Sequence, residues 1–159
     1  MTERVDPLTE LNAVPWSRLV HFYGRATAVP GHIRDLATDD HAEAEKQLRG
    51  CLEHQDGILQ ATPFAVRFIL RMLNAGQVRD PSAVQELLAA IRRAAQFQKE
   101  GFPSRDPLDW NSLLLPERLW PEFKSESDDE RLWEMWNPPP EEWQSWVLIT
   151  DRYLAESLG

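Results

Sequence analysis

The sequence has a single cysteine and no long apolar run. These two features argue against a disulfide-stabilised protein and against a membrane-spanning protein. Cys51 is the single cysteine, so an internal disulfide is excluded and a reducing compartment, by default the cytoplasm, is expected. No window reaches the roughly 18 apolar residues that a membrane-spanning helix needs. The start of the chain contains acidic side chains and no apolar core, so we expect no signal peptide.

Basic residues are scarce in the last third of the chain. The net charge is −9, and residues 101–159 hold 13 acidic and 5 basic residues, whereas residues 1–100 hold 13 and 12. This balance repels the phosphates of nucleic acids and of anionic membranes. We therefore expect no nucleic acid and no membrane as partner, and expect instead a protein with a basic surface.

Runs of alternating β-branched residues are also absent, whereas apolar residues recur at helical spacing, so the predicted class is all-α. The clearest helix is predicted at residues 62–73, where Thr62 can cap the N-terminus and Pro63 fits the first helical position. Arg67, Arg71 and Asn74 fall on its opposite, polar face. The predicted buried stripe contains Ala61, Ala65, Val66, Phe68, Ile69, Leu70, Met72 and Leu73.

About five amphipathic helices of this kind are predicted in residues 15–101, joined by short turns. The first should bury Trp16 and Tyr23 and end at Gly24, and Asp80 should cap the last one. Each helix needs its neighbours to cover its apolar face. The predicted architecture is therefore a short antiparallel helical array, similar to an α-solenoid, although a compact bundle satisfies the same pattern.

Two flanking segments complete the predicted single domain. Residues 1–14 form a polar arm that is expected to dock through Val5, Leu8 and Leu11. Residues 102–159 form an acidic extension that contains six of the seven tryptophans. Because disordered tails usually have few aromatic residues, we expect this C-terminal extension to fold and to pack on the array.

Helix start signals occur twice in the extension. Ser127 with Glu130 makes a capping box, which predicts a short helix that ends before the prolines at 138–140. Glu141 and Glu142 are predicted to begin a last helix, since acidic side chains favour the first turn. The predicted apolar positions of this last helix are Trp143, Trp146, Val147, Tyr153 and Leu154.

Residues 16–36, WSRLVHFYGRATAVPGHIRDL, contain a tryptophan segment, a Tyr-Gly turn and a proline-opened helix. Residues 52–73, LEHQDGILQATPFAVRFILRML, contain a His-Gln turn before an Ala-Thr-Pro helix. This arrangement resembles bacterial HEAT-like repeat proteins over roughly residues 15–100. The resemblance implies an α-solenoid-like fold and no particular activity, and some similar small helical-repeat proteins act as immunity or adaptor proteins. The matching residues are Trp16, Tyr23, Gly24, Pro30, His54, Gln55, Gly57, Ala61 and Thr62.

The residue types that usually carry chemistry do not form a recognisable motif. His21, His32, His41 and His54 never pair at helical spacing, and HExxH, CxxC, GxSxG and phosphate-binding loops are missing. We interpret His54 as a structural residue near a helix end and Cys51 as a buried thiol. The sequence therefore predicts no catalytic residue, no cofactor and no bound metal.

Acidic residues surround the tryptophans of the C-terminal extension, and this combination is the candidate partner-binding site. Aromatic anchors ringed by carboxylates suit a basic protein surface. In the competing interpretation, the tryptophans only staple the extension to its own core and the acidic residues solubilise it. The candidate residues are Asp128, Asp129, Glu130, Trp133, Glu134, Trp136, Glu141 and Glu142.

The predicted function is a non-catalytic protein-binding module, an immunity or adaptor protein in a bacterial cell. Such a protein would cover a basic partner surface with carboxylates and would need no chemistry of its own. The alternative is an enzyme or regulator that uses a pocket between the helical array and the C-terminal extension. Convergent polar residues with a shifted pKa would support that alternative.

Overall fold

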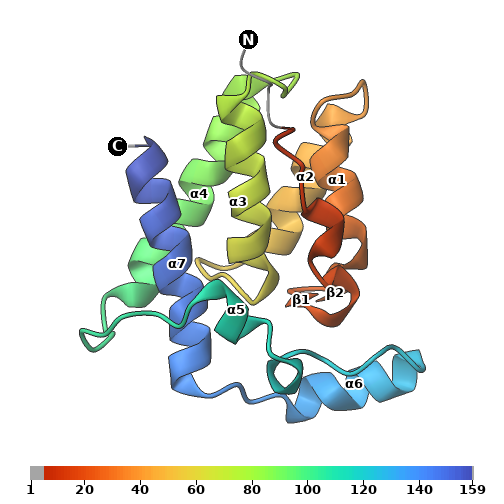
Figure 1. The fold of residues 1–159 in the computed structure, drawn as a ribbon, viewed down its shortest axis with the longest axis vertical. Helices are drawn as coiled ribbons and strands as arrows, with labels where there is room; N and C mark the ends of the chain where they lie inside the picture. The colour runs from red at the N-terminus through yellow and green to blue at the C-terminus, as the bar shows by residue number, and fades with distance from the viewer. Residues whose placement is uncertain (1–5, 159) are drawn as a thin grey trace.

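The computed structural model describes residues 6–158, which form a mainly helical molecule with a small two-stranded hairpin, β1 (Val20–His21) and β2 (Gly24–Arg25) (Figure 1). At this level the predicted all-α class is confirmed. None of the helices in residues 6–158 is both long enough and apolar enough to cross a membrane. The α-helices are α1 (Val29–Asp35), α2 (His41–Leu52), α3 (Ala61–Asn74), α4 (Pro81–Lys99), α5 (Trp110–Leu113), α6 (Glu126–Met135) and α7 (Pro140–Leu158). Single 3-10 turns lie at Leu11–Ala13, Trp16–Arg18, Ala26–Ala28 and Pro116–Arg118.

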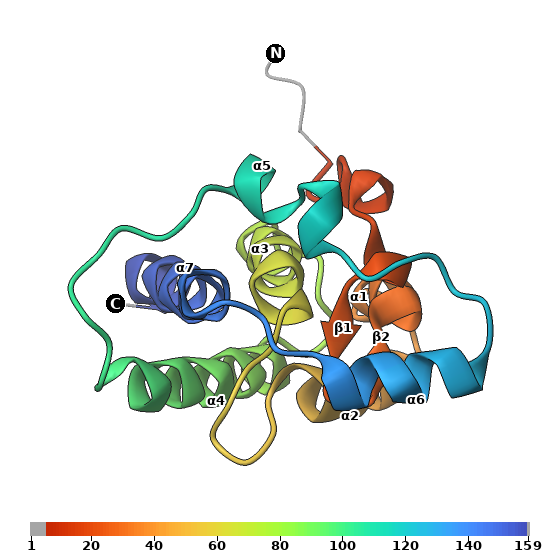
Figure 2. The same cartoon turned by 90° about the horizontal axis from the view of Figure 1, so that it is seen from below.

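Helix α3 lies at the centre of the molecule, and α1, α2, α4 and α7 all contact it (Figure 1, Figure 2). A helix that is apolar around most of its circumference is stable only where other elements cover every side. The wide stripe predicted for this helix is confirmed, since ten of its fourteen residues are buried. They are Ala61, Thr62, Pro63, Phe64, Ala65, Val66, Phe68, Ile69, Leu70 and Met72.

The predicted cap of α3 is wrong. The helix begins at Ala61, so Pro63 is its third residue rather than its first, although it still lies in the turn whose N–H groups have no helical partner. Thr62 is buried, and its Oγ1 donates a hydrogen bond to the carbonyl of Leu52 at 2.8 Å. Thr62 therefore satisfies the C-terminal end of α2, and this bond links the two helices.

The predicted polar face of α3 is covered by the C-terminal extension at Arg67. The guanidinium of Arg67 lies 5.5 Å from the ring centroid of Trp110 and 5.9 Å from that of Phe68, and the guanidinium of Arg71 lies 5.3 Å from the Phe68 centroid. Asn74 is exposed as predicted. The assignment of Arg67 to a solvated face is wrong, because α5 brings Trp110 onto its side chain. Arg71 is partly buried, and the aromatic ring that it contacts belongs to α3 itself.

A 3-10 turn and a hairpin replace the helix that was predicted to end at Gly24. Trp16 is buried as predicted, but Tyr23 is 69% exposed at the tip of the hairpin. Gly24 pairs with His21 and has a φ of 124°, a conformation that glycine adopts without steric cost. The two-residue loop of Phe22 and Tyr23 interrupts the helical spacing, and the predicted burial of Tyr23 is therefore wrong.

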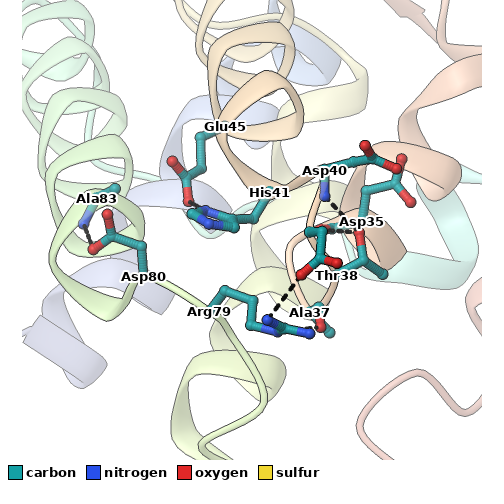
Figure 3. A network of polar contacts seen from close by, with 10 residues as sticks. Asp35, Ala37, Thr38, Asp40, His41, Glu45, Arg79, Asp80 and Ala83 are labelled. Carbon is teal, nitrogen blue, oxygen red and sulfur yellow. Dashed lines mark hydrogen bonds and ion pairs between the residues drawn. The ribbon is translucent and has the colours of Figure 1, made fainter.

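A polar network joins the α1–α2 turn to the α3–α4 turn (Figure 3). Arg79 donates from Nε to the carbonyl of Ala37 at 3.0 Å and from Nη1 to Asp39 Oδ1 at 3.1 Å. Asp80 accepts a hydrogen bond from the N–H of Ala83 at 3.1 Å and caps α4 as predicted. The two bonds from Arg79 therefore link the α1–α2 turn to the α3–α4 turn at the surface, whereas the bond of Asp80 is local to α4.

The C-terminal extension packs on the array through α7, which lies against α3 and α4 (Figure 2). The residues of α7 that belong to the shared hydrophobic core are Trp146, Val147, Ile149 and Leu154.

Helix α6 is capped by Ser125, whose Oγ accepts a hydrogen bond from the N–H of Asp128 at 3.2 Å. The predicted capping box at Ser127 is therefore wrong by two residues.

The N-terminal segment docks on the same core. Leu11 is buried, and Leu8 packs against the core as a partly buried side chain. The indole N–H of Trp16 donates to the carbonyl of Leu11 at 2.8 Å. The predicted contact of Val5 lies outside the described residues.

Truncating Phe68 to alanine should lower the free energy of unfolding by about 3–5 kcal/mol, because its ring is buried in the central helix. Arg67→Ala should cost about 1 kcal/mol through lost stacking on Trp110. Asn74→Ala is the exposed control on the same helix and should cost less than about 0.5 kcal/mol. Urea unfolding measures all three variants, and equal losses at Phe68 and Asn74 would show that α3 is rotated from this orientation.

Candidate functional site

Helix α6 runs below the β1–β2 hairpin in the view of Figure 1. A groove lined by residues of both elements opens between them. Its volume is about 890 Å³, which lies within the range of known ligand pockets. We call this cavity the α6 groove. Its main lining side chains are Tyr23, Arg25, Phe123, Glu130, Trp133 and Glu134.

One face of α6 forms the acidic wall of the groove. Glu126, Glu130 and Glu134 recur every four residues, and Asp129 and Trp133 lie between them at spacings of three and four. Residues at these spacings share one face of a helix. The acidic residues of the first turn are also favoured by the positive end of the helix dipole. The result is a row of carboxylates with a tryptophan inside it.

Arg25 of β2 holds the hairpin and α6 together. Its Nε and Nη2 donate to Oδ2 and Oδ1 of Asp129, each at 2.8 Å. Its Nη1 donates to the carbonyls of Ser17 at 2.8 Å and Pro121 at 2.6 Å. The Arg25 side chain is 8% exposed, so its charge is buried but bonded on both sides of the guanidinium. One side chain therefore fixes three chain segments relative to one another.

The same guanidinium lies over two aromatic rings. The distances to the ring centroids are 5.5 Å for Trp120 and 5.7 Å for Phe123. The hydrogen bonds from Arg25 hold the pKa of Asp129 below its usual range, so this carboxylate stays ionised and the pair persists at neutral pH. The inner wall of the groove is thus an arginine that lies over two aromatic rings and is neutralised by one carboxylate.

Four tryptophans lead from the groove into the core. The ring of Trp133 lies 6.0 Å from that of Trp120 and 5.8 Å from that of Trp136. Trp136 stacks on Trp146 at 5.7 Å with an interplanar angle of 22°. Trp120 and Trp146 are buried and Trp136 is partly buried, whereas Trp133 is 40% exposed. Trp136 therefore staples the extension to the core, and Trp133 presents part of its ring to the groove.

His21 positions the hairpin tip that carries Tyr23. Its Nδ1 accepts a hydrogen bond from the backbone N–H of Tyr23 at 3.0 Å, which places the ring proton of the neutral imidazole on Nε2. Burial, with a smaller contribution from His32, lowers the pKa of His21 to about 4. The imidazole is therefore neutral at physiological pH and keeps the acceptor that orients the tip.

Exposed aromatic rings concentrate at this groove. Six large hydrophobic side chains are exposed in the described part of the chain, and Tyr23, Phe123 and Trp133 are the three that line the α6 groove. Single exposed hydrophobic residues are ordinary on protein surfaces. Three rings converging on one cavity make the α6 groove the candidate interaction site of the described residues.

The structure brings four of the eight predicted site residues into the groove. They are Asp129, Glu130, Trp133 and Glu134. Asp128 faces a second, smaller hollow on the other side of α6, near Leu132 and Met135. Trp136 lies behind the groove, in the tryptophan chain that enters the core.

The two acidic residues at the start of α7 lie away from these four. Glu141 is exposed, whereas Glu142 is 6% exposed and its Oε2 lies 4.0 Å from Nε of Arg118. Burial raises the pKa of Glu142, an effect that Arg118 opposes. Acidic residues in the first turn of a helix are usually exposed, but α7 directs the Glu142 side chain toward the 3-10 turn at Pro116–Arg118 and buries it.

Sequence reasoning missed the half of the groove that comes from outside α6. Tyr23 was expected in a helix core, and Arg25 and Phe123 were not singled out. The Tyr-Gly pair before Arg25 was the local signal for a turn that exposes the tyrosine. The pairing of Arg25 with Asp129, 104 residues later, has no local signal.

The structure also places the residues that were considered for chemistry. Within residues 6–158, no group of three or more histidine, cysteine, aspartate or glutamate side chains is placed to hold a metal ion. The predicted burial of Cys51 is confirmed, and burial raises the pKa of its thiol, which disfavours the reactive thiolate. His54 lies in a tight turn beyond α2, where its N–H donates to the carbonyl of Gly57 at 3.0 Å.

Replacing Arg25 by alanine should lower the free energy of unfolding by about 3 kcal/mol, because Asp129 and two carbonyls lose their donor. Arg25→Lys should restore little, since an ammonium cannot make the same planar set of bonds and stacking contacts. The control is Arg79→Ala, which removes an exposed arginine paired with Asp39 and should cost less than about 1 kcal/mol. Equal losses at the two arginines, measured by urea unfolding, would contradict the assigned role of Arg25.

Stability should also fall as the pH is lowered from about 6.5 to about 4. The pKa of His21 is near 6.5 in the unfolded chain and about 4 in the folded one, so the unfolded state binds more protons in this window. His21→Asn keeps an acceptor for the N–H of Tyr23 but does not titrate there. This variant should lose less stability than the wild type between about pH 7 and about pH 5. The free energy of unfolding of both proteins is measured at the two pH values. If the variant and the wild type lose the same amount, the burial of a neutral His21 is contradicted.

Comparison of the chain with protein-family models, with curated proteins and with solved structures found no match. The resemblance to HEAT-like repeat proteins therefore stays a prediction. The function proposed below rests on the geometry of the α6 groove.

Proposed function

We propose that this chain is a non-catalytic protein-binding module, an immunity or adaptor protein of the bacterial cytoplasm, whose α6 groove takes a basic segment of its partner. One observation carries the proposal. Three exposed aromatic rings and three glutamates of α6 converge on a single cavity of about 890 Å³. The bound partner surface would be covered by carboxylates, without any chemistry on the part of this protein.

The charge of the groove supports a basic partner. Arg25 and Asp129 neutralise each other, which leaves Glu126, Glu130 and Glu134 as the net charge of the lining. The ion pairs found within residues 6–157 involve other carboxylates, so these three remain available to a cation. Complementary charge speeds association and excludes acidic partners.

The aromatic rings supply the contact area. Trp133 is held from behind by Trp120 and Trp136, and the tip that carries Tyr23 is held by His21. Rings that are already oriented lose little conformational entropy on binding, and tryptophan and tyrosine are enriched among the residues that dominate binding energy. Affinity is therefore expected from the rings, and the association rate from the carboxylates.

An enzyme or regulator that uses a pocket between the array and the extension is the alternative. The α6 groove does lie between the hairpin and the extension. However, Asp129, a lining residue whose pKa is shifted, has both carboxylate oxygens bonded to Arg25 and is not placed to act as a general base. The described geometry therefore supports binding better than it supports catalysis.

Neutralising two groove carboxylates should weaken the binding of a basic probe. The probe is a fluorescein-labelled peptide of sequence Gly-Arg-Gly-Lys-Gly-Arg-Gly-Lys, and its anisotropy is measured at low salt. Glu130→Gln combined with Glu134→Gln should raise Kd about fivefold, because two exposed ion pairs of about 0.5 kcal/mol each are lost. Unchanged melting temperatures would verify that the variants are folded.

The matched control removes the same charge elsewhere. Glu86→Gln combined with Glu141→Gln changes two exposed acidic residues outside the groove and should change Kd by less than about twofold. Equal weakening by the two double variants would mean that the peptide is attracted by net charge alone. That result, or a failure of the probe to bind the wild type, would contradict the proposed function.

A further inference from the structure

We infer that the α6 groove selects arginine over lysine, and that it takes an extended partner segment with arginines at alternate positions. This inference rests on the proposed function, because it specifies which basic segment the groove takes. It is drawn from the way in which the protein already holds one arginine of its own at the inner wall of the same cavity.

The contacts of Arg25 show how a guanidinium binds in this part of the groove. The group lies over the rings of Trp120 and Phe123 and shares both nitrogen edges with acceptors, including both oxygens of Asp129. Aromatic faces and a carboxylate together fit a planar, delocalised cation. The inner half of the groove is thus a filled guanidinium site.

The outer half of the groove also contains aromatic rings and carboxylates, and among the described lining residues the one cation is Arg25, which is paired with Asp129. Tyr23 and Trp133 supply partly exposed rings at 69% and 40%, and Glu130 and Glu134 supply exposed carboxylates. Trp133 lies next to Trp120, so the outer aromatic surface continues the one that Arg25 occupies. A guanidinium from a partner would therefore stack beside the internal one, with its N–H edges toward the neighbouring α6 carboxylates.

A guanidinium suits this surface better than an ammonium does. A guanidinium stacks its flat face on aromatic rings while its edges donate to carboxylates, and it is more weakly hydrated than an ammonium. A lysine ammonium is a compact, strongly hydrated point charge, which gains from the carboxylates but makes less use of the flat rings. The difference in affinity between arginine and lysine should therefore come from the contact with the aromatic rings.

The spacing of the carboxylates defines the shape of the segment. Glu126, Glu130 and Glu134 are four residues apart, and four residues of a helix rise by about 6 Å. Alternate side chains of an extended strand point to the same side and are about 6.6 Å apart. An extended chain that lies along α6 with arginines at every second position would therefore match successive carboxylates.

Two labelled peptides test the inference on the full chain. They are Gly-Arg-Gly-Arg-Gly and Gly-Lys-Gly-Lys-Gly, each with a blocked C-terminus, and binding is measured by anisotropy. The arginine peptide should bind the wild type at least about fivefold more tightly than the lysine peptide. In Trp133→Leu and in Tyr23→Leu this preference should fall below about twofold, because one ring is lost while the carboxylates remain.

Phe97→Leu is the matched control. It removes an aromatic ring that is 64% exposed but lies outside the groove, and it should leave the preference unchanged. Since Tyr23 is more exposed than Trp133, Tyr23→Leu remains informative even if Trp133→Leu fails to fold. A preference that persists in both groove variants would place the selectivity elsewhere and overturn the inference.

The remaining outcomes separate this inference from the proposed function. Equal or tighter binding of the lysine peptide would overturn the arginine selectivity while the proposed function stands. Failure of both peptides to bind would overturn both. N-acetylargininamide is a competitor with a single arginine. Its Kd should be at least about tenfold higher than that of the arginine peptide, because it can pair with one glutamate of α6 and the peptide can pair with two. A competitor as strong as the peptide would indicate a site for a small guanidinium compound and would overturn the extended segment.

Discussion

Helix α3 carries apolar side chains around most of its circumference, and the fold depends on keeping water away from all of them. The helices α1, α2 and α4 cover part of this surface, and α7 must return from the C-terminal end of the chain to cover the rest. That requirement accounts for the long crossing segment between α4 and α7. It also accounts for the stacking of Arg67 against Trp110, since the crossing segment passes over a face of α3 that its own sequence would leave in water.

The path of this crossing segment creates the α6 groove. It brings Trp120 and Phe123 over the guanidinium of Arg25, and it places Asp129 where both of its oxygens can accept from that side chain. A buried arginine is tolerated only where its charge is paired and its N–H groups are bonded, so the geometry around Arg25 is closely constrained. The rest of α6 then projects its glutamates and Trp133 into the space beside this pair, so that a structural contact forms the inner wall of the α6 groove.

Periodicity predicted the parts of the fold that depend on local pattern. The apolar stripe of α3, the cap at Asp80 and the buried Cys51 were all readable from neighbouring residues. Prediction failed where a residue bonds to another element. Thr62 has the sequence context of a helix cap but bonds to the end of α2. Glu142 has the context of an exposed first-turn acid, yet α7 buries it against Arg118.

The sequence by itself determined that the chain is mainly helical, that α3 is covered on most sides, and that α6 has carboxylates and a tryptophan on one face. Those properties depend on spacings of three and four residues, which a helix converts directly into a shared face. Tertiary structure alone decided which of the acidic residues meet aromatic rings. Arg25 and Asp129 are 104 residues apart, and their contact exists because α7 must pack on α3, which carries the preceding segment beneath the hairpin. The spacing of neighbouring residues cannot predict such a distant pairing, because the pairing is stabilised by the burial of the whole hydrophobic core.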